Sequence, residues 1–175
     1  ISKKINKKRV KCDALITNQK KIPIGVLTAD CAPIIIFDPK KTMISVVHVG
    51  WRGAFKGIIK NVITFFKKKG SKPKDLIAVV GPAISVKNYE IKKDFLKKFL
   101  NKNKKNKIYF KFFHNKIFFD LRKYIFFQIK KLGINKLEII NKDTFSEKNS
   151  YFSARRSLIK KQNDYGRNIS LIMIN

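Results

Sequence analysis

The first third of the chain carries apolar runs of strand length. Segments 12–17, 22–28, 33–37 and 43–49 are rich in β-branched residues, and 33–37 is apolar throughout, as in a fully buried strand. The turn signal D-P-K-K occupies 38–41, between the last two runs. We therefore expect a β-hairpin over 33–49.

Helical patterns alternate with short strands in the rest of the chain. Helices are expected at 54–69, 91–100 and 120–132, the last capped by Asp120, because apolar residues recur there at helical spacing. Strands are expected at 76–80, 136–140 and 169–174, with a hairpin over 108–119. Segment 141–168 is expected to be mostly irregular, and 1–11 to form an edge strand or a frayed start. No repeat or linker divides the chain, so the pattern predicts one α+β domain over 1–175.

The net charge of +30 suggests a nucleic-acid-binding protein, but the kind of basic residue argues against it. Lysine supplies 35 of the 41 basic residues, whereas a nucleic-acid site is expected to use arginine, whose planar fork grips phosphate and guanine. Lysine, asparagine, isoleucine and phenylalanine are all abundant and all encoded by AT-rich codons, so genome-wide drift explains the composition. A basic nucleic-acid-binding protein is kept as an alternative, and nucleic acid is not an expected partner.

The sequence predicts neither a membrane partner nor export. No apolar run reaches the roughly 18 residues that a transmembrane helix requires, and no signal-peptide pattern is present. The two cysteines, Cys12 and Cys31, do not make a disulfide framework in a chain of this length. We therefore expect a cytoplasmic protein in a reducing compartment.

Candidate chemistry lies at the ends of the predicted hairpin, in T-A-D-C-A-P at 28–33 and H-V-G-W-R-G at 48–53. The start of one antiparallel strand lies beside the end of the next, so we expect Cys31, His48 and Arg52 to meet at one sheet edge. A cysteine and a histidine there form part of a zinc site, a thiol nucleophile with its base, or an ordinary piece of core. The flanking glycines favour a ligand site, and Arg52 suits an anion such as phosphate.

The same segments carry a family resemblance. T-A-D-C-A-P-I-I-I-F-D and V-V-H-V-G-W-R-G-A-F-K-G-I resemble the signature of the multicopper polyphenol oxidase-like, or laccase-domain (YfiH-type), purine nucleoside phosphorylase family. The resemblance continues through G-P-A-I at 81–84, Y-E at 89–90, F-D-L at 119–121, Y-F-S-A-R-R at 151–156 and G-R at 166–167. It covers nearly the whole chain and implies a four-layer α/β/β/α sandwich.

The resemblance also implies a zinc-dependent purine nucleoside phosphorylase. Its substrates would be phosphate with adenosine, inosine, guanosine or methylthioadenosine, and adenosine deaminase activity would accompany phosphorolysis. Cys31 and His48 are the zinc ligands that carry over, and a third, a histidine in an upstream Q-V-H segment, has no counterpart here. The other histidine, His114, matches no ligand motif and is expected on the surface. We therefore expect a single laccase domain that lacks its N-terminal segment.

Arginine is retained in the family's segments although lysine is the common cation elsewhere, which suggests a need for guanidinium geometry. The arginines expected to bind substrate or phosphate are Arg52, Arg155, Arg156 and Arg167. The expected catalytic residues are Asp30, Cys31 and Arg52, with Asp30 orienting a ligand, moving a proton or capping a turn. A metal-free Cys31/His48 thiol hydrolase is a further alternative. Copper, which the family's historical name suggests, is poorly served by one cysteine and one histidine.

Overall fold

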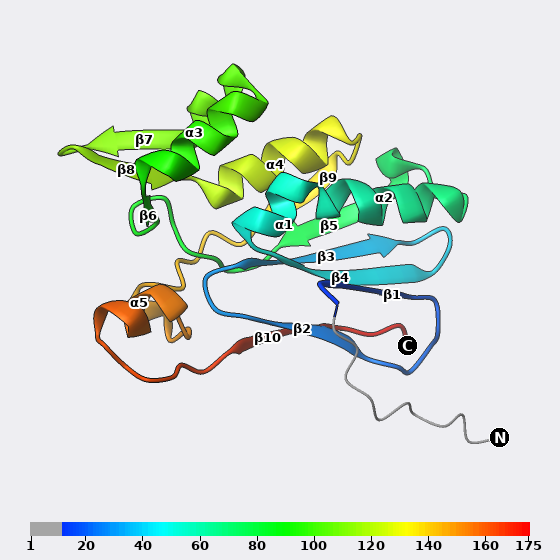
Figure 1. Ribbon diagram of the computed structural model, residues 1–175. Helices are drawn as coiled ribbons and strands as arrows, with labels where there is room; N and C mark the ends of the chain where they lie inside the picture. The colour runs from blue at the N-terminus through cyan, green and yellow to red at the C-terminus, as the bar shows by residue number, and fades with distance from the viewer. Residues whose placement is uncertain (1–11) are drawn as a thin grey trace.

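The computed structural model describes residues 12–175, and these form a mixed α+β structure with three sheets, as the sequence predicts (Figure 1). The strands are β1 (Ala14–Thr17), β2 (Ile24–Thr28), β3 (Ala32–Asp38), β4 (Met43–Val49), β5 (Ile77–Val80), β6 (Glu90–Ile91), β7 (Phe110–Phe113), β8 (Lys116–Phe119), β9 (Lys136–Ile139) and β10 (Asn168–Ile172). The helices are α1 (Trp51–Lys56), α2 (Ile58–Lys68), α3 (Lys93–Lys102), α4 (Leu121–Lys131) and α5 (Ala154–Ile159).

The predicted hairpin of β3 and β4 is the centre of a five-stranded sheet. The strand order is β1-β4-β3-β5-β9, and every neighbouring pair is antiparallel except β5 and β9. The Asp38 side chain closes the hairpin turn by accepting hydrogen bonds from the backbone N–H groups of Lys40 and Lys41 at 2.8 and 3.1 Å. This local pairing confirms the turn signal and fixes the register of both strands.

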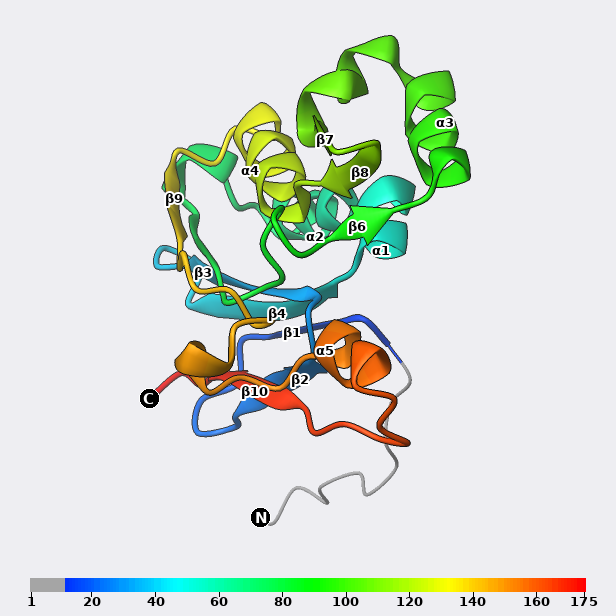
Figure 2. The ribbon, with the colours of Figure 1, turned by 90° about the vertical axis from the view of Figure 1, so that its left-hand side faces the viewer.

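Helices α1, α2 and α4 cover one face of the five-stranded sheet (Figures 1 and 2). Alternate strand residues such as Ile34, Val47 and Val80 point to that side and pack against Ile63 and Phe66 of α2 in the main core. The expected helix over 54–69 instead starts at Trp51 and is broken at Gly57, whose φ of 90° ends α1. Glycine adopts that left-handed backbone without steric cost, so the chain can redirect there.

A two-stranded sheet, β2 paired with β10, lies on the opposite side of the five-stranded sheet (Figure 2). We call this pair the ribbon. The described chain therefore stacks helices, the five-stranded sheet and the ribbon in that order, with α5 beside the ribbon. Segment 141–168 is mostly irregular, as expected, and the short helix α5 lies inside it.

The third sheet, with order β6-β8-β7, sits above α1 together with α3. Its hairpin turns at His114 and Asn115, as predicted, and both residues have positive φ. Aromatic residues join this unit to the core, because Trp51 of α1 packs on Phe95 and Phe99 of α3 with ring centroids 4.6 and 6.3 Å apart. None of the described helices is long and apolar enough to cross a membrane. The expectation for residues 1–11 lies outside the described residues.

Candidate active site

The register of the hairpin puts Cys31 and His48 on the same face of the five-stranded sheet. Pro33 pairs directly with His48 and Ala32 with Val49, so Cys31, one residue earlier, lies across from Gly50. Directly opposed residues share a face and side chains alternate along a strand, so Cys31 and His48 are diagonal neighbours on one face. That face is turned away from the main helical core, because the alternate residues Ala32, Ile34 and Val49 belong to that core.

Gly50 makes room for the Cys31 sulfur. A Cβ atom at position 50 would lie 2.8 Å from Sγ of Cys31, closer than real Cβ contacts come. Any other residue would therefore push the thiol away from the strand end. The glycine that follows β4 is required by this close approach of the Cys31 sulfur.

Asp13 holds the imidazole of His48 from one side. It directly precedes β1, and its backbone oxygen accepts a hydrogen bond from the His48 backbone N–H at 2.7 Å. Its carboxylate Oδ1 lies 3.1 Å from His48 Nδ1. When Nδ1 carries the proton and donates it to Asp13, Nε2 presents its lone pair to a ligand. The sequence analysis missed Asp13, because only the pairing of β1 with β4 reveals it.

The Cys31 thiol sits in an environment that disfavours its anion. Burial, followed by the negative charges of Asp30 and Asp13, raises the pKa of Cys31 to about 11. At neutral pH the isolated side chain is therefore a thiol and not a thiolate. Two carboxylates beside a buried thiol are also the surroundings in which a cation is stabilised, and a metal ion would deprotonate the sulfur.

A cavity of 210 Å³ opens beside Cys31. It lies between the residues just before β3, the segment between β5 and β6, the start of α4, and α5. Its lining residues are Ala29, Asp30, Cys31, Ile84, Tyr89, Leu121, Ala154, Arg155 and Leu158. Most of this lining is apolar, and Arg155 is its one basic member. Burial raises the pKa of the Tyr89 hydroxyl, which therefore stays protonated in the cavity wall. Such a lining suits a flat apolar group joined to an anion.

Asp30 anchors the helix that carries Arg155. The carboxylate is nearly buried; Oδ1 accepts a hydrogen bond from the Thr144 hydroxyl at 2.8 Å, and Oδ2 accepts one from the Arg155 backbone N–H at 2.6 Å. The Arg155 guanidinium donates to the Glu90 carbonyl at 2.9 Å and lies over the ring of Tyr89. Asp30 thereby fixes the wall of the cavity from 125 residues away along the chain.

The four arginines expected to bind substrate are not all gathered in this cavity. Arg155 lines the cavity, and Arg52 is exposed on α1 with its guanidinium 4.5 Å from the centre of the Trp51 ring. Arg156 donates to the backbone carbonyls of Thr144, Phe145 and Tyr151, which ties α5 to the preceding loop. Arg167 stacks on Tyr165 and pairs with Asp164 on the surface.

The two residues expected to bind zinc, Cys31 and His48, lie on the same face of the sheet, and a catalytic zinc site requires three protein ligands. Cys31 and His48 offer the sulfur and nitrogen donors that zinc prefers. No cluster of three histidine, cysteine or acidic side chains suited to a metal occurs within residues 12–175. The donor set therefore fits zinc in kind but not in number.

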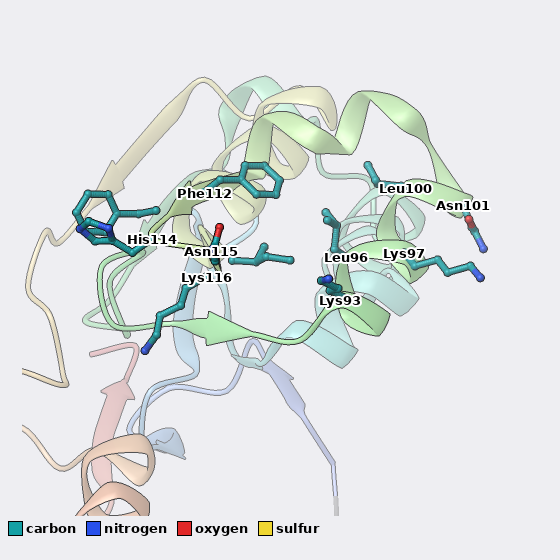
Figure 3. Close-up of a pocket in the computed structure, with 11 residues that line it drawn as sticks. Lys93, Leu96, Lys97, Leu100, Asn101, Phe112, His114, Asn115 and Lys116 are labelled. Atoms are coloured by element: carbon teal, nitrogen blue, oxygen red, sulfur yellow. The ribbon is translucent and has the colours of Figure 1, made fainter.

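A larger cavity lies elsewhere, in a groove of 970 Å³ between α3 and the β7–β8 hairpin (Figure 3). Leu96, Leu100 and Phe112 give it an apolar floor, and its rim carries lysines. His114 is exposed at the end of this groove, as the sequence analysis predicted for a surface residue. The groove holds none of the predicted site residues, so size alone does not identify the active site.

Comparison with known proteins agrees with the motif analysis. Residues 2–175 match the family described as multi-copper polyphenol oxidoreductase laccase. The chain is 35% identical over 159 residues to a purine nucleoside phosphorylase of Rickettsia conorii, covering 90% of this chain and 65% of that protein. It is 31% identical over 166 residues to a purine nucleoside phosphorylase of Haemophilus influenzae, covering 93% of this chain and 65% of the relative.

The fold is also similar to that of a solved structure. The hypothetical protein YfiH of Bacillus licheniformis superposes with a TM-score of 0.83 at 26% sequence identity, covering 93% of this chain and 61% of that chain. The chain thus spans a little under two thirds of the length of the relatives that it matches. From motifs, matched length and fold together, the chain belongs to the multi-copper polyphenol oxidoreductase laccase family.

Proposed function

We propose that the chain forms the active-site portion of a zinc-dependent purine nucleoside phosphorylase that also deaminates adenosine. The observation that carries this is the apolar cavity in which Cys31, Tyr89 and Arg155 meet, beside the Asp13–His48 pair. The names of the relatives from Rickettsia conorii and Haemophilus influenzae support the reaction class. The proposed nucleosides are adenosine, inosine, guanosine and methylthioadenosine.

In the proposed phosphorolysis, some cavity residues bind the phosphate and others bind the purine base. In this reaction a phosphate oxygen attacks C1′ of the ribose, the bond from C1′ to the purine nitrogen breaks, and the purine leaves with the electron pair. Arg155 supplies a fixed guanidinium for the phosphate, since its backbone is held by Asp30 and its side chain by the Glu90 carbonyl. The apolar walls at Ile84 and Leu121 pack on the purine, and the Tyr89 hydroxyl is a donor for its ring nitrogens.

Cys31 and His48 are the residues that would hold zinc. A bound zinc ion supplies the Lewis acidity for hydrolytic attack at the purine C6 position, which is the deaminase reaction. A catalytic zinc takes three protein ligands, so we propose that at least one comes from outside residues 12–175. Within the chain, Asp13 orients His48, and Gly50 leaves room for the Cys31 sulfur.

The other predicted site residues are proposed to position groups or to act through their charge. Asp30 acts as a positioning residue, because both of its carboxylate oxygens already accept hydrogen bonds from protein groups. The positive charge of Arg52 acts at the edge of the cavity, where it lowers the pKa of Tyr89 against the larger effect of burial. Arg156 and Arg167 contribute to phosphate attraction by charge and to the structure of α5 and its neighbours.

The complete protein that we propose is a single four-layer α/β/β/α domain of the cytoplasm. The two sheets packed face to face, with helices on one outer side, support this proposal, since they would form three of the four layers. Both cysteines are free thiols in the described chain, which suits a reducing compartment. The length of the relatives that this chain does not match leaves room for the remaining layer.

The raised pKa of Cys31 weighs against a metal-free thiol hydrolase. Such an enzyme needs a thiolate at neutral pH, usually next to a positive charge. Here burial and two carboxylates raise the pKa of Cys31 to about 11, and His48 is engaged by Asp13. Copper chemistry would need a larger set of histidines than the chain provides.

The test compares two cysteines in the same chain. The chain is joined to the segment of the Rickettsia conorii protein that it does not match, loaded with zinc, and incubated with adenosine and phosphate. Chromatography follows adenine, hypoxanthine and ribose-1-phosphate. Cys31→Ser is expected to lower the turnover of adenosine by about a hundredfold or more, since it removes a proposed zinc ligand. Cys12→Ser, at an exposed cysteine, is the matched control and is expected to leave turnover unchanged.

The outcomes separate the parts of the proposal. Stoichiometric zinc with no product from any of the four nucleosides would refute the proposed substrates. Equal turnover in the Cys31→Ser variant and its parent would refute the role of Cys31. Inactivation by an alkylating agent, with no effect of a chelator, would favour the thiol hydrolase.

A further inference from the structure

The groove between α3 and the β7–β8 hairpin lies on the side of the five-stranded sheet away from the ribbon (Figures 1 and 3). We call it the α3 groove. Helix α3 lines it with residues spaced by three or four, which form one stripe along the helix: Lys93, Leu96, Lys97, Leu100 and Asn101. A neighbouring stripe, at Phe95 and Phe99, packs on the core. The helix thus divides its apolar side chains between the core and the groove.

The hairpin leaves an aromatic side chain uncovered at the α3 groove. Side chains alternate along a strand, so Phe110 and Phe112 point to the same side of β7. The Phe110 ring is buried against the rings of Phe95 and Phe99, at centroid distances of 6.2 and 5.7 Å. Phe112 is 54% exposed and points into the space between the hairpin and α3, where its strand partner Ile117 also lines the groove (Figure 3). The apolar side of the hairpin therefore continues past the part that packs on the core, and exposed apolar surface of this kind marks an interaction site.

The charge around this apolar floor has one sign. Lys93, Lys97 and Lys116 line the α3 groove, and its lining within the described chain includes no acidic residue. Lys116 pairs with Glu90 at 3.1 Å, but Lys93 and Lys97 take part in none of the five ion pairs between residues 12–175. Lysine is common over the whole chain, so the apolar floor sets this place apart and the lysines determine the charge of what binds there.

We propose that the α3 groove binds an acidic amphipathic helix of another protein. Helix α3 has 10 residues and is therefore about 15 Å long, which matches a partner helix of about three turns. Apolar side chains of the partner at positions i, i+3, i+4 and i+7 fill the floor at Leu96, Leu100 and Phe112. Carboxylates beside them pair with Lys93 and Lys97. This binding does not rest on the activity proposed above and adds a protein partner to it.

Charge and shape decide against two other occupants. A second copy of the chain would bring together two molecules of formal charge +30. It also offers no acidic helix, because α3 alone among the five described helices contains an acidic residue, Asp94. A flat anionic lipid surface would meet Phe113, which is 66% exposed beside the hairpin turn, but would not reach Leu96 and Leu100, which are half-buried between the helix and the hairpin.

The experiment measures binding of a labelled synthetic helix by fluorescence anisotropy, at about 0.15 M salt to screen long-range attraction. The helix carries leucine at i, i+3, i+4 and i+7 and glutamate beside them, and a peptide of the same residues in scrambled order is the reference. The floor variant is Phe112→Ser, with Phe65→Ser, at a 40% exposed aromatic residue on α2, as its control. The rim variant is Lys93→Glu with Lys97→Glu. Its control, Lys60→Glu with Lys67→Glu on α2, changes the net charge equally.

The expected result is a one-to-one complex with the amphipathic helix. The scrambled peptide should bind the parent at least about tenfold more weakly, and the floor and rim variants should bind the amphipathic helix at least about tenfold more weakly than their controls. Hydrogen exchange of the unsubstituted chain provides a check that needs no folded variant: amides of α3 and of the β7–β8 hairpin should gain protection when the helix is added, and those of α2 should not.

Three results would overturn the proposal. The first is equal affinity for the amphipathic and scrambled peptides, or no binding of either, which would leave only attraction by net charge. The second is sedimentation of the chain with vesicles of phosphatidylglycerol and phosphatidylcholine that Phe112→Ser abolishes, without peptide binding, which would make a lipid surface the occupant. The third is loss of peptide binding when the chain is joined to the segment of the Rickettsia conorii protein that it does not match, which would place the occupant within the same protein.

Discussion

At the scale of single residues, Asp13 contacts His48 through both its carboxylate and its backbone oxygen. Asp13 is 62% exposed at its side chain and His48 34%, so water competes for the contact. The backbone bond between the same two residues nevertheless holds their positions opposite each other. Asp13 therefore acts through orientation, and its effect should appear in the affinity for a metal more than in stability.

Replacing Asp13 by alanine is expected to weaken zinc binding by about 10- to 100-fold, the usual effect of removing a carboxylate behind a ligand histidine. Zinc affinity is measured by competition with a chelator. The protein used is the chain joined to the segment of the Rickettsia conorii protein that it does not match. Asp94→Ala, at an exposed carboxylate on α3, is the matched control and should bind zinc like the parent. Equal affinities in the two variants would show that Asp13 does not orient His48.

Sequence reasoning predicted Cys31 and His48 but not their surroundings. The hairpin that joins these two residues is local, and its turn is visible in the sequence. Asp13 is placed by the pairing of β1 with β4, and a lone aspartate gives no signal of such a contact. Tyr89 belongs to a segment that carries the family resemblance, but its place in the cavity wall appears only in the structure. Arg156 was expected in the substrate site because its motif was recognised, and its backbone contacts appear only in the structure.

At the scale of elements, Asp143 ties together two loops that follow parallel strands. Its Oδ1 accepts from the backbone N–H groups of Ser85 and Phe145 at 3.0 Å each, and its Oδ2 accepts from Ser85 Oγ at 2.7 Å and Asn88 Nδ2 at 2.6 Å. The loop held in this way carries Ile84 and Tyr89 to the cavity. Burial by itself raises the pKa of Asp143, but these hydrogen bonds outweigh it and leave the pKa below its ordinary value of 3.8.

This depressed pKa predicts a particular dependence on pH. A carboxyl whose pKa is lower in the folded state stabilises the fold fully above its unfolded pKa, and the contribution is lost as pH falls through the folded pKa. This loss of stability should therefore occur below about pH 4. Urea unfolding between about pH 2 and 6 should show a shallower acid decline in Asp143→Asn than in the parent. The same slope in both proteins would refute the contribution of Asp143.

The helices and strands were predictable where a periodic pattern was long enough. Helix α4 was expected with its cap, and the Asp120 side chain does accept from the Lys123 backbone N–H at 2.9 Å. Helix α5 was missed because A-R-R-S-L-I is too short for a helical period to appear, and its capping by Ser153 and attachment to Asp30 come from tertiary contacts. The break at Gly57 was missed because the apolar positions continue across it.

At the scale of the whole molecule, the excess of lysine destabilises the folded state, and few ion pairs offset this effect. The described residues contain five ion pairs, one of which involves a histidine, while the chain holds 41 basic and 11 acidic residues. Like charges spread over the surface repel one another and destabilise the folded state. Salt should therefore stabilise this protein instead of weakening it.

Raising sodium chloride from about 0.05 M to about 0.5 M is expected to raise Tm, because the screening length falls from more than about 10 Å to about 4 Å. Calorimetry measures the shift, and potassium chloride should give the same result if screening is the cause. A fall in Tm would mean that the ion pairs outweigh the repulsion. A rise with phosphate at millimolar concentration alone would instead indicate a bound anion.

The hairpin of β3 and β4 also determines the order in which the proposed metal donors come together. Hairpins form in about 1–10 μs, whereas a ribosome adds about 5–20 residues per second. Cys31 and His48 therefore lie side by side soon after β4 leaves the ribosome, while Tyr89 and Arg155 are still to be synthesised. For the metal site proposed above, this order means that both donors would meet an ion before the proposed nucleoside cavity is complete, so metal supply during translation, and not only afterwards, would bear on how the site is filled.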